Sequence, residues 1–302
     1  MKNNQLMIYG AYGYAGELMV REAVAQGLRP IIAGRDDEKL KPIATELSLE
    51  CRAFGVRNTG SNLQDISVLL NCAGPFSATA EPLARACLAQ QIHYLDITGE
   101  IDIFRKCHAL DEEARQQNVL ILPGAGTDIV PTDCLAAMLK EKLPVATRID
   151  LALSFGTNPS IGTVNTMIES FGKGGLIREG GMLKVVSNAF QMRKIPFQNK
   201  PQWAMTIPWG DVFTSGISTG VPDGAVYMAM PRMSIYMIRL TNPVKGILNT
   251  QFGQKITKRL AGWLMKKGPD AKALEAGRGQ FWGEAEAPDG EKLEMTMSTP
   301  NV

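Results

Sequence analysis

Three glycines close to the N-terminus have the spacing of a turn that can hold a pyrophosphate. Gly10, Gly13 and Gly16 follow a short apolar run, Leu6 to Tyr9, and precede a stretch with a helical pattern, Tyr14 to Gln26. A glycine-rich turn lets the backbone approach a phosphate, and the helix directs its first N–H groups at it. The spacing GxxGxxG is less specific than GxGxxG, so the position after the first strand carries the prediction. We expect the cofactor-binding residues of this turn to be Gly10, Tyr12, Gly13, Tyr14, Ala15 and Gly16.

The end of the second predicted strand distinguishes between the two nicotinamide cofactors. An Asp or Glu there accepts a hydrogen bond from the ribose 2′-hydroxyl of NAD, whereas a guanidinium suits the 2′-phosphate of NADP. Here the strand ends in Gly34 and Arg35, and Lys39 adds a positive charge one helical turn later. Asp36 and Asp37 favour NAD, but Asp36 also suits the N-cap of the next helix. The sequence therefore favours NADP, with NAD as the alternative.

A third turn, Asn71 to Phe76, follows an apolar strand. In a parallel sheet this turn lies beside the glycine turn, near the pyrophosphate and the nicotinamide ribose. Gly74 would let the backbone pass under the cofactor, and Pro75 would fix the turn. Phe76 would line the nicotinamide side of the cofactor site or, alternatively, fill a domain interface. We expect Asn71, Ala73, Gly74, Pro75 and Phe76 to join the cofactor site, and two similar turns, Asp96 to Glu100 and Pro123 to Asp128, to lie at the same edge.

Strands and helices alternate through the first part of the chain, which predicts a parallel sheet covered on both faces. The predicted strands are 6–9, 31–33, 51–56, 67–72, 92–96 and 119–122. The predicted helices are 14–26, 36–47, 79–90, with Pro82 in its first turn, and 101–118. A chain of 302 residues is long for one core. We therefore predict the α/β class, with a Rossmann-type doubly wound NAD(P)-binding domain at 1–126 and a second α+β substrate or dimerisation domain with a mixed sheet at 127–302.

The second half shows patterns of both strand and helix. Arg148 to Phe155 alternates apolar and polar residues, as a strand with two unlike faces does. Further strands are predicted at 182–189, 225–230 and 292–297, and a helix at 162–171 that stops at 172–175. Residues 254–267 form a basic amphipathic helix, interpreted as a solvated face at a subunit or domain edge rather than a lipid-binding surface. The sequence leaves open whether the protein forms a homodimer.

Composition excludes several classes of function. The net charge of +2 gives no reason to expect a nucleic-acid partner or a strong membrane attraction. No apolar run approaches the ~20 residues that span a bilayer, so no stable membrane insertion is expected. The five cysteines include no CxxC pair, and there are only two histidines, so we expect no metal site and no disulfide framework. Reduced thiols and the absence of a visible N-terminal signal predict a cytoplasmic protein.

The catalytic groups are less well marked than the cofactor site. The acid candidates are Asp96, Glu100, Asp128, Asp133 and Asp211, and none of the six tyrosines is followed four residues later by the lysine of a short-chain dehydrogenase. Asp128 could donate a proton or cap a helix, and Asp211 could do so or serve as a turn or interdomain residue. Arg178, flanked by glycines, could hold a substrate carboxylate or phosphate, or could be a surface loop residue. Asp128, Arg178 and Asp211 are the catalytic candidates.

The motifs GAYGYAG, AGR, LLNCAGPF, HYLDITGE and PGAGTDIVPTD, in this order, resemble those of the saccharopine dehydrogenase-like oxidoreductases. The branch that the chain resembles contains the trans-acting enoyl reductases. Weaker similarity continues through the short motifs at 160–163, 178–181, 208–211, 218–220, 268–269 and 281–283. The resemblance implies hydride transfer from NADPH to an unsaturated small-molecule acceptor. Proteins of this family usually continue beyond the point where this chain ends, so we expect the C-terminal part to be incomplete.

Two substrate classes and one non-catalytic role follow from this resemblance. One is reduction of a C=C bond in an acyl or enoyl substrate, and the other is C=N chemistry on an amino-acid adduct. The adduct carries several carboxylates, whereas the arginines of the second half are few and well separated. An apolar substrate suits the methionines and tryptophans there, although core packing also explains them: Met167, Met182, Met192, Trp203, Met205 and Trp209. The third alternative is a non-catalytic NADP-binding regulator.

Overall fold

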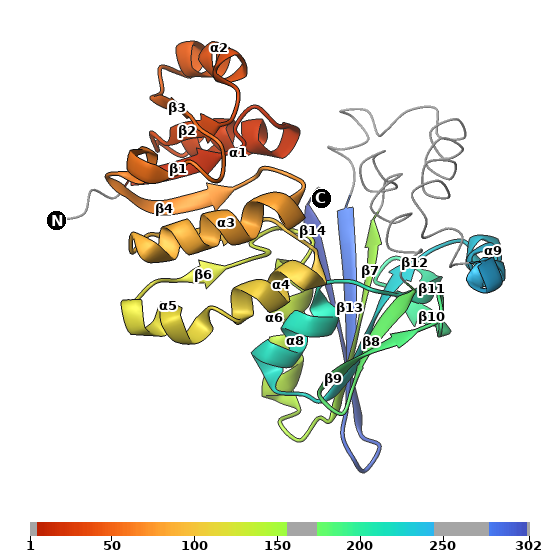
Figure 1. Cartoon of the computed structure of the whole chain (residues 1–302). Coiled ribbons are helices and arrows are strands. Elements are labelled where there is room, and N and C mark those ends of the chain that lie inside the picture. Colours follow the sequence, from red (N-terminus) through yellow and green to blue (C-terminus); the bar gives the residue numbers. More distant parts are fainter. Residues whose placement is uncertain (1–4, 156–173, 245–277, 301–302) are drawn as a thin grey trace. The chain divides into compact units, whose positions relative to one another are not determined.

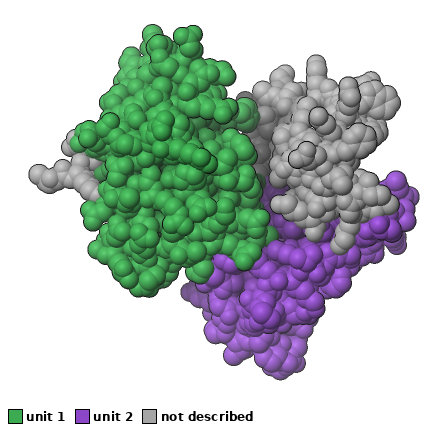
Figure 2. All heavy atoms as spheres, in the orientation of Figure 1, with its two compact units in different colours: residues 1–128 green, residues 129–302 purple. Residues whose placement is uncertain are grey.

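The structure is a computed structural model, and it describes residues 5–155, 174–244 and 278–300. The chain divides into two compact units, residues 1–128 and 129–302, which are coloured separately in Figure 2. The division falls two residues after the boundary drawn from the sequence, at 128 rather than 126. The helices predicted at 162–171 and 254–267 lie outside the described residues.

The sheet of the first unit is built entirely from parallel strands, in the order β3-β2-β1-β4-β5-β6 (Figure 1). Its strands are β1 (Gln5–Tyr9), β2 (Ile31–Gly34), β3 (Cys51–Ala53), β4 (Ile66–Asn71), β5 (His93–Asp96) and β6 (Ile121–Leu122). The order reverses direction between β1 and β4. Such a reversal is the place where doubly wound sheets bind ligands, beyond the carboxyl ends of the strands.

Helices cover both faces of this sheet because successive strand residues point to opposite sides. Met7 and Tyr9 of β1 are buried in a core with α3 (Phe76–Ala89), α4 (Ile101–His108) and α5 (Asp111–Gln117). Ile8, between them, is buried in a second core with α1 (Tyr14–Ala25) and α2 (Asp37–Leu47). The predicted Rossmann-type doubly wound unit is therefore confirmed.

Three predicted elements of the first unit differ from the structure. The helix predicted at 101–118 is two helices, because the chain tightens at Leu110, whose N–H bonds to Cys107 rather than to the residue four before it. The α3 helix begins at Phe76, so Pro82 lies inside the helix and not in its first turn. The third strand ends at Ala53 and is followed by a loop and the 3-10 turn η1 (Gly60–Leu63).

The second unit contains a mixed sheet, which confirms the predicted α+β organisation. Its main path runs β10-β11-β12-β7-β13-β14, in which only β12 and β7 pair in parallel (Figure 1). Two further strands, β8 (Gly175–Glu179) and β9 (Met182–Val186), form a hairpin joined to β12. The main strands are β7 (Arg148–Phe155), β10 (Met192–Pro196), β11 (Pro201–Ile207), β12 (Asp223–Ala229), β13 (Arg278–Glu286) and β14 (Lys292–Pro300).

The described helices of this unit are α6 (Val130–Lys142), α8 (Asp211–Thr219) and α9 (Arg232–Leu240), followed by the 3-10 turn η2 (Asn242–Val244). The α6 helix packs closely on the apolar face of the sheet, where a Cβ added at Gly283 of β13 would lie 2.6 Å from Leu139. Leu151 of β7 shares this contact, as its alternating pattern predicted. The opposite face carries the ion-paired residues Asp150, Arg193 and Glu284 beside a second apolar cluster around Trp282.

Candidate cofactor site

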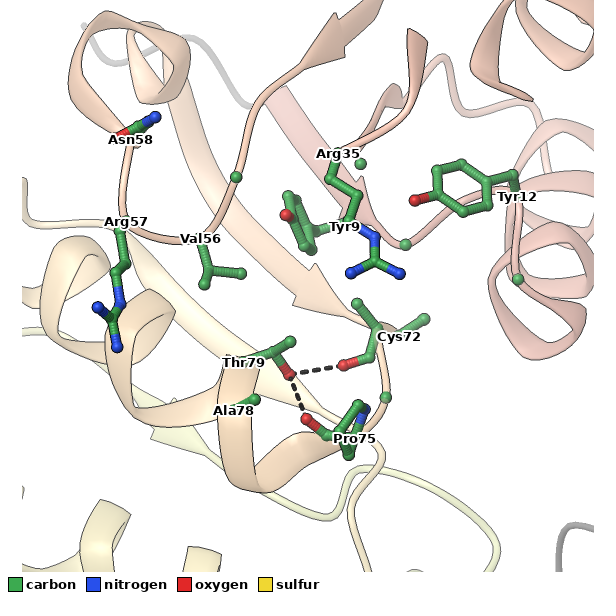
Figure 3. A pocket seen from close by; sticks show the side chains of 16 residues that line it. Tyr9, Tyr12, Arg35, Val56, Arg57, Asn58, Cys72, Pro75, Ala78 and Thr79 are labelled. Atoms are coloured by element: carbon green, nitrogen blue, oxygen red, sulfur yellow. Dashed lines mark hydrogen bonds between the residues drawn. The ribbon is translucent and has the colours of Figure 1, made fainter. Parts of the chain in front are cut away.

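A pocket of about 500 Å³ opens at the carboxyl ends of β1, β2 and β4, and it lies wholly within the first unit (Figure 3). Four turns contribute to its wall: the glycine turn, the end of β2, the loop after β3 and the turn after β4. The lining residues are Tyr9, Gly10, Tyr12, Gly13, Gly34, Arg35, Gly55, Val56, Arg57, Asn58, Cys72, Ala73, Gly74, Pro75, Ala78 and Thr79.

The glycine turn is held by contacts that exclude larger residues. Gly10 has a φ of +85°, and a Cβ added to it would lie 2.7 Å from the backbone nitrogen of Ala73. A Cβ on Gly16 would lie 2.1 Å from the carbonyl oxygen of Gly10, so α1 could not approach the turn so closely with any other residue. Gly13 stands at the N-cap of α1 and provides no side-chain cap. The first N–H groups of α1 are thus available to an anion.

At the end of β2, Arg35 directs its guanidinium into the pocket, between Tyr9, Tyr12 and Cys72 (Figure 3). Gly34 lies under the ring of Tyr12, because a Cβ there would be 2.6 Å from that ring. An arginine is long enough to reach a ribose 2′-phosphate from this strand end, and its fork of N–H donors matches phosphate oxygens.

The other charged residues near Arg35 already contact one another. Asp36 caps α2, since its Oδ1 accepts a hydrogen bond from the Lys39 N–H at 3.3 Å, which confirms the predicted N-cap. The Lys39 ammonium pairs with Asp36 at 3.3 Å and lies 5.7 Å from the centre of the Tyr12 ring. Lys39 therefore stabilises the wall of the pocket rather than adding an unpaired charge to it.

The loop after β3 is the part of the site that the sequence analysis missed. Gly55, Val56, Arg57 and Asn58 all line the pocket, and Figure 3 shows Val56 pointing into it. Extending the third strand to residue 56 hid these residues, because a strand would have turned alternate side chains away. The signal that could have found them is Gly55, a strand breaker two residues before the exposed Arg57.

The turn after β4 forms the remaining wall. Thr79 of α3 donates a hydrogen bond to the carbonyl of Ala73 at 2.6 Å and lies 3.4 Å from that of Pro75, so the helix holds the turn (Figure 3). The Cys72 thiol is buried at the edge of the pocket, and burial raises its pKa to about 12. That thiol is therefore neutral and unreactive at physiological pH.

Eight of the predicted cofactor residues line the pocket and five do not. The eight are Gly10, Tyr12, Gly13, Gly34, Arg35, Ala73, Gly74 and Pro75. Of the others, Tyr14 points to solvent, Ala15 lies on α1 outside the lining, and Gly16 supports the turn from below. Asn71 is fully buried behind the turn, and Phe76 packs against the core of the first unit. The structure thus favours packing over the predicted nicotinamide wall for Phe76.

The acid candidates of the first unit occupy different environments. Asp96 is fully buried and accepts hydrogen bonds from Tyr94 and two backbone N–H groups. Glu100 stands at the N-cap of α4 without a side-chain cap bond. Asp128 is half-buried beside the turn after β5, where a Cβ added to Gly99 would lie 3.6 Å from its Oδ2. Burial raises the pKa of the Asp128 carboxyl. Asp128 is not the N-cap of α6, which is Ile129.

The candidates of the second unit are interior residues. Arg178 lies in strand β8, not in a loop, and only 4% of it is exposed. Its guanidinium donates to the carbonyls of Val221 and Val212, and burial lowers its pKa. Asp211 opens α8, is fully buried and accepts a hydrogen bond from Thr132 at 2.8 Å. These contacts join β8, α6 and α8 to one another.

Metal and membrane features were sought in the same described residues. Nowhere in 5–155, 174–244 or 278–300 do three or more His, Cys, Asp or Glu side chains gather as metal ligands would. The described helices are all too short or too polar to cross a bilayer.

The geometry of the pocket agrees with the family to which the first unit is similar. Residues 6–122 match the family model described as the saccharopine dehydrogenase NADP binding domain. The first unit is a saccharopine dehydrogenase-type NADP-binding domain. The match covers the parallel sheet from Leu6 onward and the whole lining of the pocket, so the resemblance drawn from the motifs of this unit is confirmed.

Relatives of the whole chain are distant and longer. A saccharopine dehydrogenase-like oxidoreductase of Rattus norvegicus is 25% identical over 231 residues, which are 67% of this chain and 53% of that protein. A putative trans-acting enoyl reductase of Mycobacterium tuberculosis is 28% identical over 205 residues, 61% of this chain and 44% of that protein. The chain thus spans about half the length of these curated relatives.

One solved structure has the same fold along nearly the whole chain. The apo saccharopine dehydrogenase (L-Glu forming) of Saccharomyces cerevisiae aligns with a TM-score of 0.65 at 9% identity, and the alignment covers 98% of this chain and 85% of that one. At this identity the likeness establishes the fold alone. The similarity of fold therefore includes the mixed sheet of the second unit as well as the parallel sheet of the first.

Proposed function

We propose that the protein is an NADPH-dependent reductase that transfers a hydride to an unsaturated small molecule, with the C=C bond of an acyl or enoyl substrate favoured. Bound NADPH would supply the hydride. Gly10, Gly13 and the N-terminus of α1 would hold its pyrophosphate, and Arg35 its 2′-phosphate. The observation that carries the proposal is the Arg35 guanidinium, directed into a glycine-walled pocket of a saccharopine dehydrogenase-type domain.

The arginines of the second unit support a C=C acceptor over an amino-acid adduct. Recognition of several carboxylates needs several available guanidinium groups. Five described arginines are instead engaged within the unit: Arg148 with Asp150, Arg178 with carbonyls, Arg193 with Glu284, Arg232 over Trp203 and Arg239 with the carbonyl of Ala189. For C=N chemistry on an adduct rich in carboxylates, the carboxylates would have to be bound by other cationic residues, such as Arg278.

The methionines and tryptophans give less support to an apolar substrate than the sequence indicated. Met205 is fully buried in the core, Met182 lies 73% exposed on the β8–β9 hairpin, and Trp203 lies beneath Arg232. They are spread over the unit, so core packing accounts for much of the pattern. The preference for an enoyl substrate therefore rests on the arginines and on the distant relative named as an enoyl reductase.

The proposal is tested by binding first and chemistry second. Titration of the protein with NADPH, followed by nicotinamide fluorescence, should show saturable binding that is tighter than binding of NADH. Oxidation of NADPH should then be followed at its absorbance maximum with a panel of enoyl thioesters and, in parallel, with imines formed from 2-oxo acids and amino acids. Faster turnover of the imines would replace the favoured substrate by the alternative. Binding without turnover of any acceptor would favour the non-catalytic NADP-binding regulator.

A further inference from the structure

A buried chain of hydrogen bonds runs behind the cofactor pocket, from a carboxylate in β5 to the turn after β4. Asp96 accepts the hydroxyl proton of Tyr94 at 2.8 Å. The Tyr94 oxygen in turn accepts an N–H of Asn71 at 3.1 Å, and the Asn71 Oδ1 accepts the backbone N–H of Ala73 at 3.0 Å. The three side chains are fully buried. This series of hydrogen bonds therefore ends at Ala73, the residue against which Gly10 packs.

The Asn71 side chain uses both of its N–H donors and its oxygen in this series of hydrogen bonds. The second N–H of Asn71 lies 3.3 Å from Thr79 Oγ1, whose hydroxyl donates to the Ala73 carbonyl. Both peptide groups of Ala73 are thus held by side chains, one from β4 and one from α3. Asparagine alone offers two donors and an acceptor in this shape, and a fully satisfied buried network fixes one geometry.

The same carboxylate also holds the turns after β5 and β6. Asp96 Oδ1 accepts the N–H of Thr98 at 3.0 Å and the N–H of Gly124 at 2.9 Å. The backbone carbonyl of Asp96 accepts the N–H of Ala125 at 2.7 Å. One buried residue therefore connects three successive turns at the carboxyl edge of the sheet.

These three turns belong to one half of the dinucleotide site. A sheet of order β3-β2-β1-β4-β5-β6 consists of two mononucleotide-binding halves. The half with β1, β2 and β3 carries Arg35 and would therefore receive the adenosine end. The half with β4, β5 and β6 would receive the nicotinamide end, and the turns after its three strands are tied to Asp96. Asp96 itself cannot touch a ligand, because it is fully buried and accepts three hydrogen bonds.

We propose that Asp96 and Tyr94 are positioning residues for the nicotinamide half of the cofactor, acting through Asn71 on the turn after β4. This inference rests on the proposed function. Loss of the Tyr94 hydroxyl leaves the Asn71 amide without one of its two acceptors, so the turn at Ala73 gains freedom. The adenosine half, held by the glycine turn and Arg35, keeps its contacts. The network should therefore affect one end of the cofactor and not the other.

The test compares two ligands that share only the adenosine end. Tyr94→Phe should weaken NADPH about three- to tenfold, the effect of one lost hydrogen bond, and reduce the nicotinamide fluorescence change. Its affinity for adenosine 2′,5′-bisphosphate, which lacks the nicotinamide half, should stay within about twofold of the native value. Thr79→Val, which removes the other tie to Ala73, should behave alike, and Thr79→Ser should restore NADPH affinity.

Tyr227→Phe is the matched control, because Tyr227 is a buried tyrosine of the second unit whose hydroxyl bonds to Gln191. It should change neither affinity. Equal weakening of both ligands by Tyr94→Phe and Thr79→Val would show a merely structural role and overturn the inference. Unchanged NADPH affinity in both variants would overturn it as well. A native protein that bound neither ligand would instead refute the proposed function, and this inference with it.

Discussion

The backbone of Ala73 lies directly against Gly10, so that a single added carbon on Gly10 would come within 2.7 Å of the Ala73 nitrogen. This contact joins the glycine turn after β1 to the turn after β4, on either side of the point where the strand order reverses. The two halves of the candidate cofactor site are therefore fixed to each other by backbone contact, and small changes here should be felt by any bound dinucleotide.

Gly10→Ala should destabilise the protein and abolish tight NADPH binding. The substitution meets Ala73 and also requires an L residue at a φ of +85°. Gly27→Ala is a matched control, since Gly27 has a φ of +81° but nothing within 4 Å of an added Cβ. The control should cost roughly 1–2 kcal/mol of stability from backbone conformation alone and leave NADPH affinity unchanged. Thermal unfolding and NADPH titration of both variants measure the difference, and equal behaviour would contradict the importance of the contact.

Arg35→Ala should weaken NADPH by about 1.5–3 kcal/mol, the range for hydrogen bonds to charged groups. NADH lacks the 2′-phosphate, so its affinity should change much less. Arg115→Ala, on the surface of α5 where Arg115 pairs with Asp111, serves as a control for charge alone. Isothermal titration with both cofactors tests the difference. Equal losses for NADPH and NADH would show that Arg35 does not contact the 2′-phosphate.

Arg57→Ala should weaken NADPH and NADH alike. Arg57 lines the pocket from the loop after β3, the neighbour of β2 in the sheet, where the adenine common to both cofactors would lie. Stacking of a guanidinium on an aromatic ring contributes about 0.5–2 kcal/mol. Binding constants measured side by side decide the outcome, and a loss confined to NADPH would assign Arg57 to the phosphate instead.

Asp128→Asn tests whether Asp128 donates the proton that completes a reduction. Burial raises the pKa of this carboxyl. The protonated, donating form therefore persists to higher pH than for an ordinary aspartate, and the rate should fall as pH rises through the raised value. The asparagine variant should lose this pH dependence and about a hundredfold in rate. A pH–rate profile that is unchanged in the variant would exclude Asp128 as the proton donor.

Glu284→Gln should destabilise the second unit in a pH-dependent way. Burial would raise the pKa of Glu284, but the hydrogen bonds and charge of Arg193, 3.0 Å away, and of Lys292 outweigh it and lower the pKa. The ion pair therefore stabilises the folded state above the ordinary pKa of glutamate, and this contribution is lost as pH falls through the lowered value. We expect a loss of about 1.5–3 kcal/mol at neutral pH. Urea unfolding at neutral and acidic pH should show the variant and native proteins converging in acid.

Local patterns predicted the parts of the fold that depend on neighbours in sequence. The alternation of Arg148 to Phe155 matched β7, because one face of that strand packs on α6 and the other carries Asp150 and Ser154 on either side of the buried Ala152. The helix predicted at 101–118 is helical on both sides of its break at Leu110, and Ile103, Cys107 and Ala114, which have helical spacing, are all buried. Periodicity reports burial, and it does not show whether the hydrogen-bond ladder continues.

Tertiary context decided what the sequence could not. Arg178 has glycines on both sides, the usual mark of a loop, yet it is a strand residue, and a Cβ added to Gly216 of α8 would lie 2.9 Å from its guanidinium. The wall of the pocket formed by Val56 and Arg57 depends on where β3 ends, and Gly55 is a weak local signal of that end. The cofactor site was predictable where the chemistry needs glycine or a charge, and it was not where backbone placement alone brings residues together.

The ring of Tyr12 over Gly34 restricts how the cofactor preference of this protein could be altered. A side chain at position 34 would collide with that ring at 2.6 Å, so an acidic residue for the ribose of NAD could be introduced there only if the tyrosine ring moved. Position 35 is the place left at this strand end, and one codon therefore controls both the gain of a carboxylate and the loss of the guanidinium. We therefore expect an acidic residue in place of Arg35 to shift the preference toward NADH, whereas a variant that keeps Arg35 beside a new acid at position 34 must also displace the Tyr12 ring.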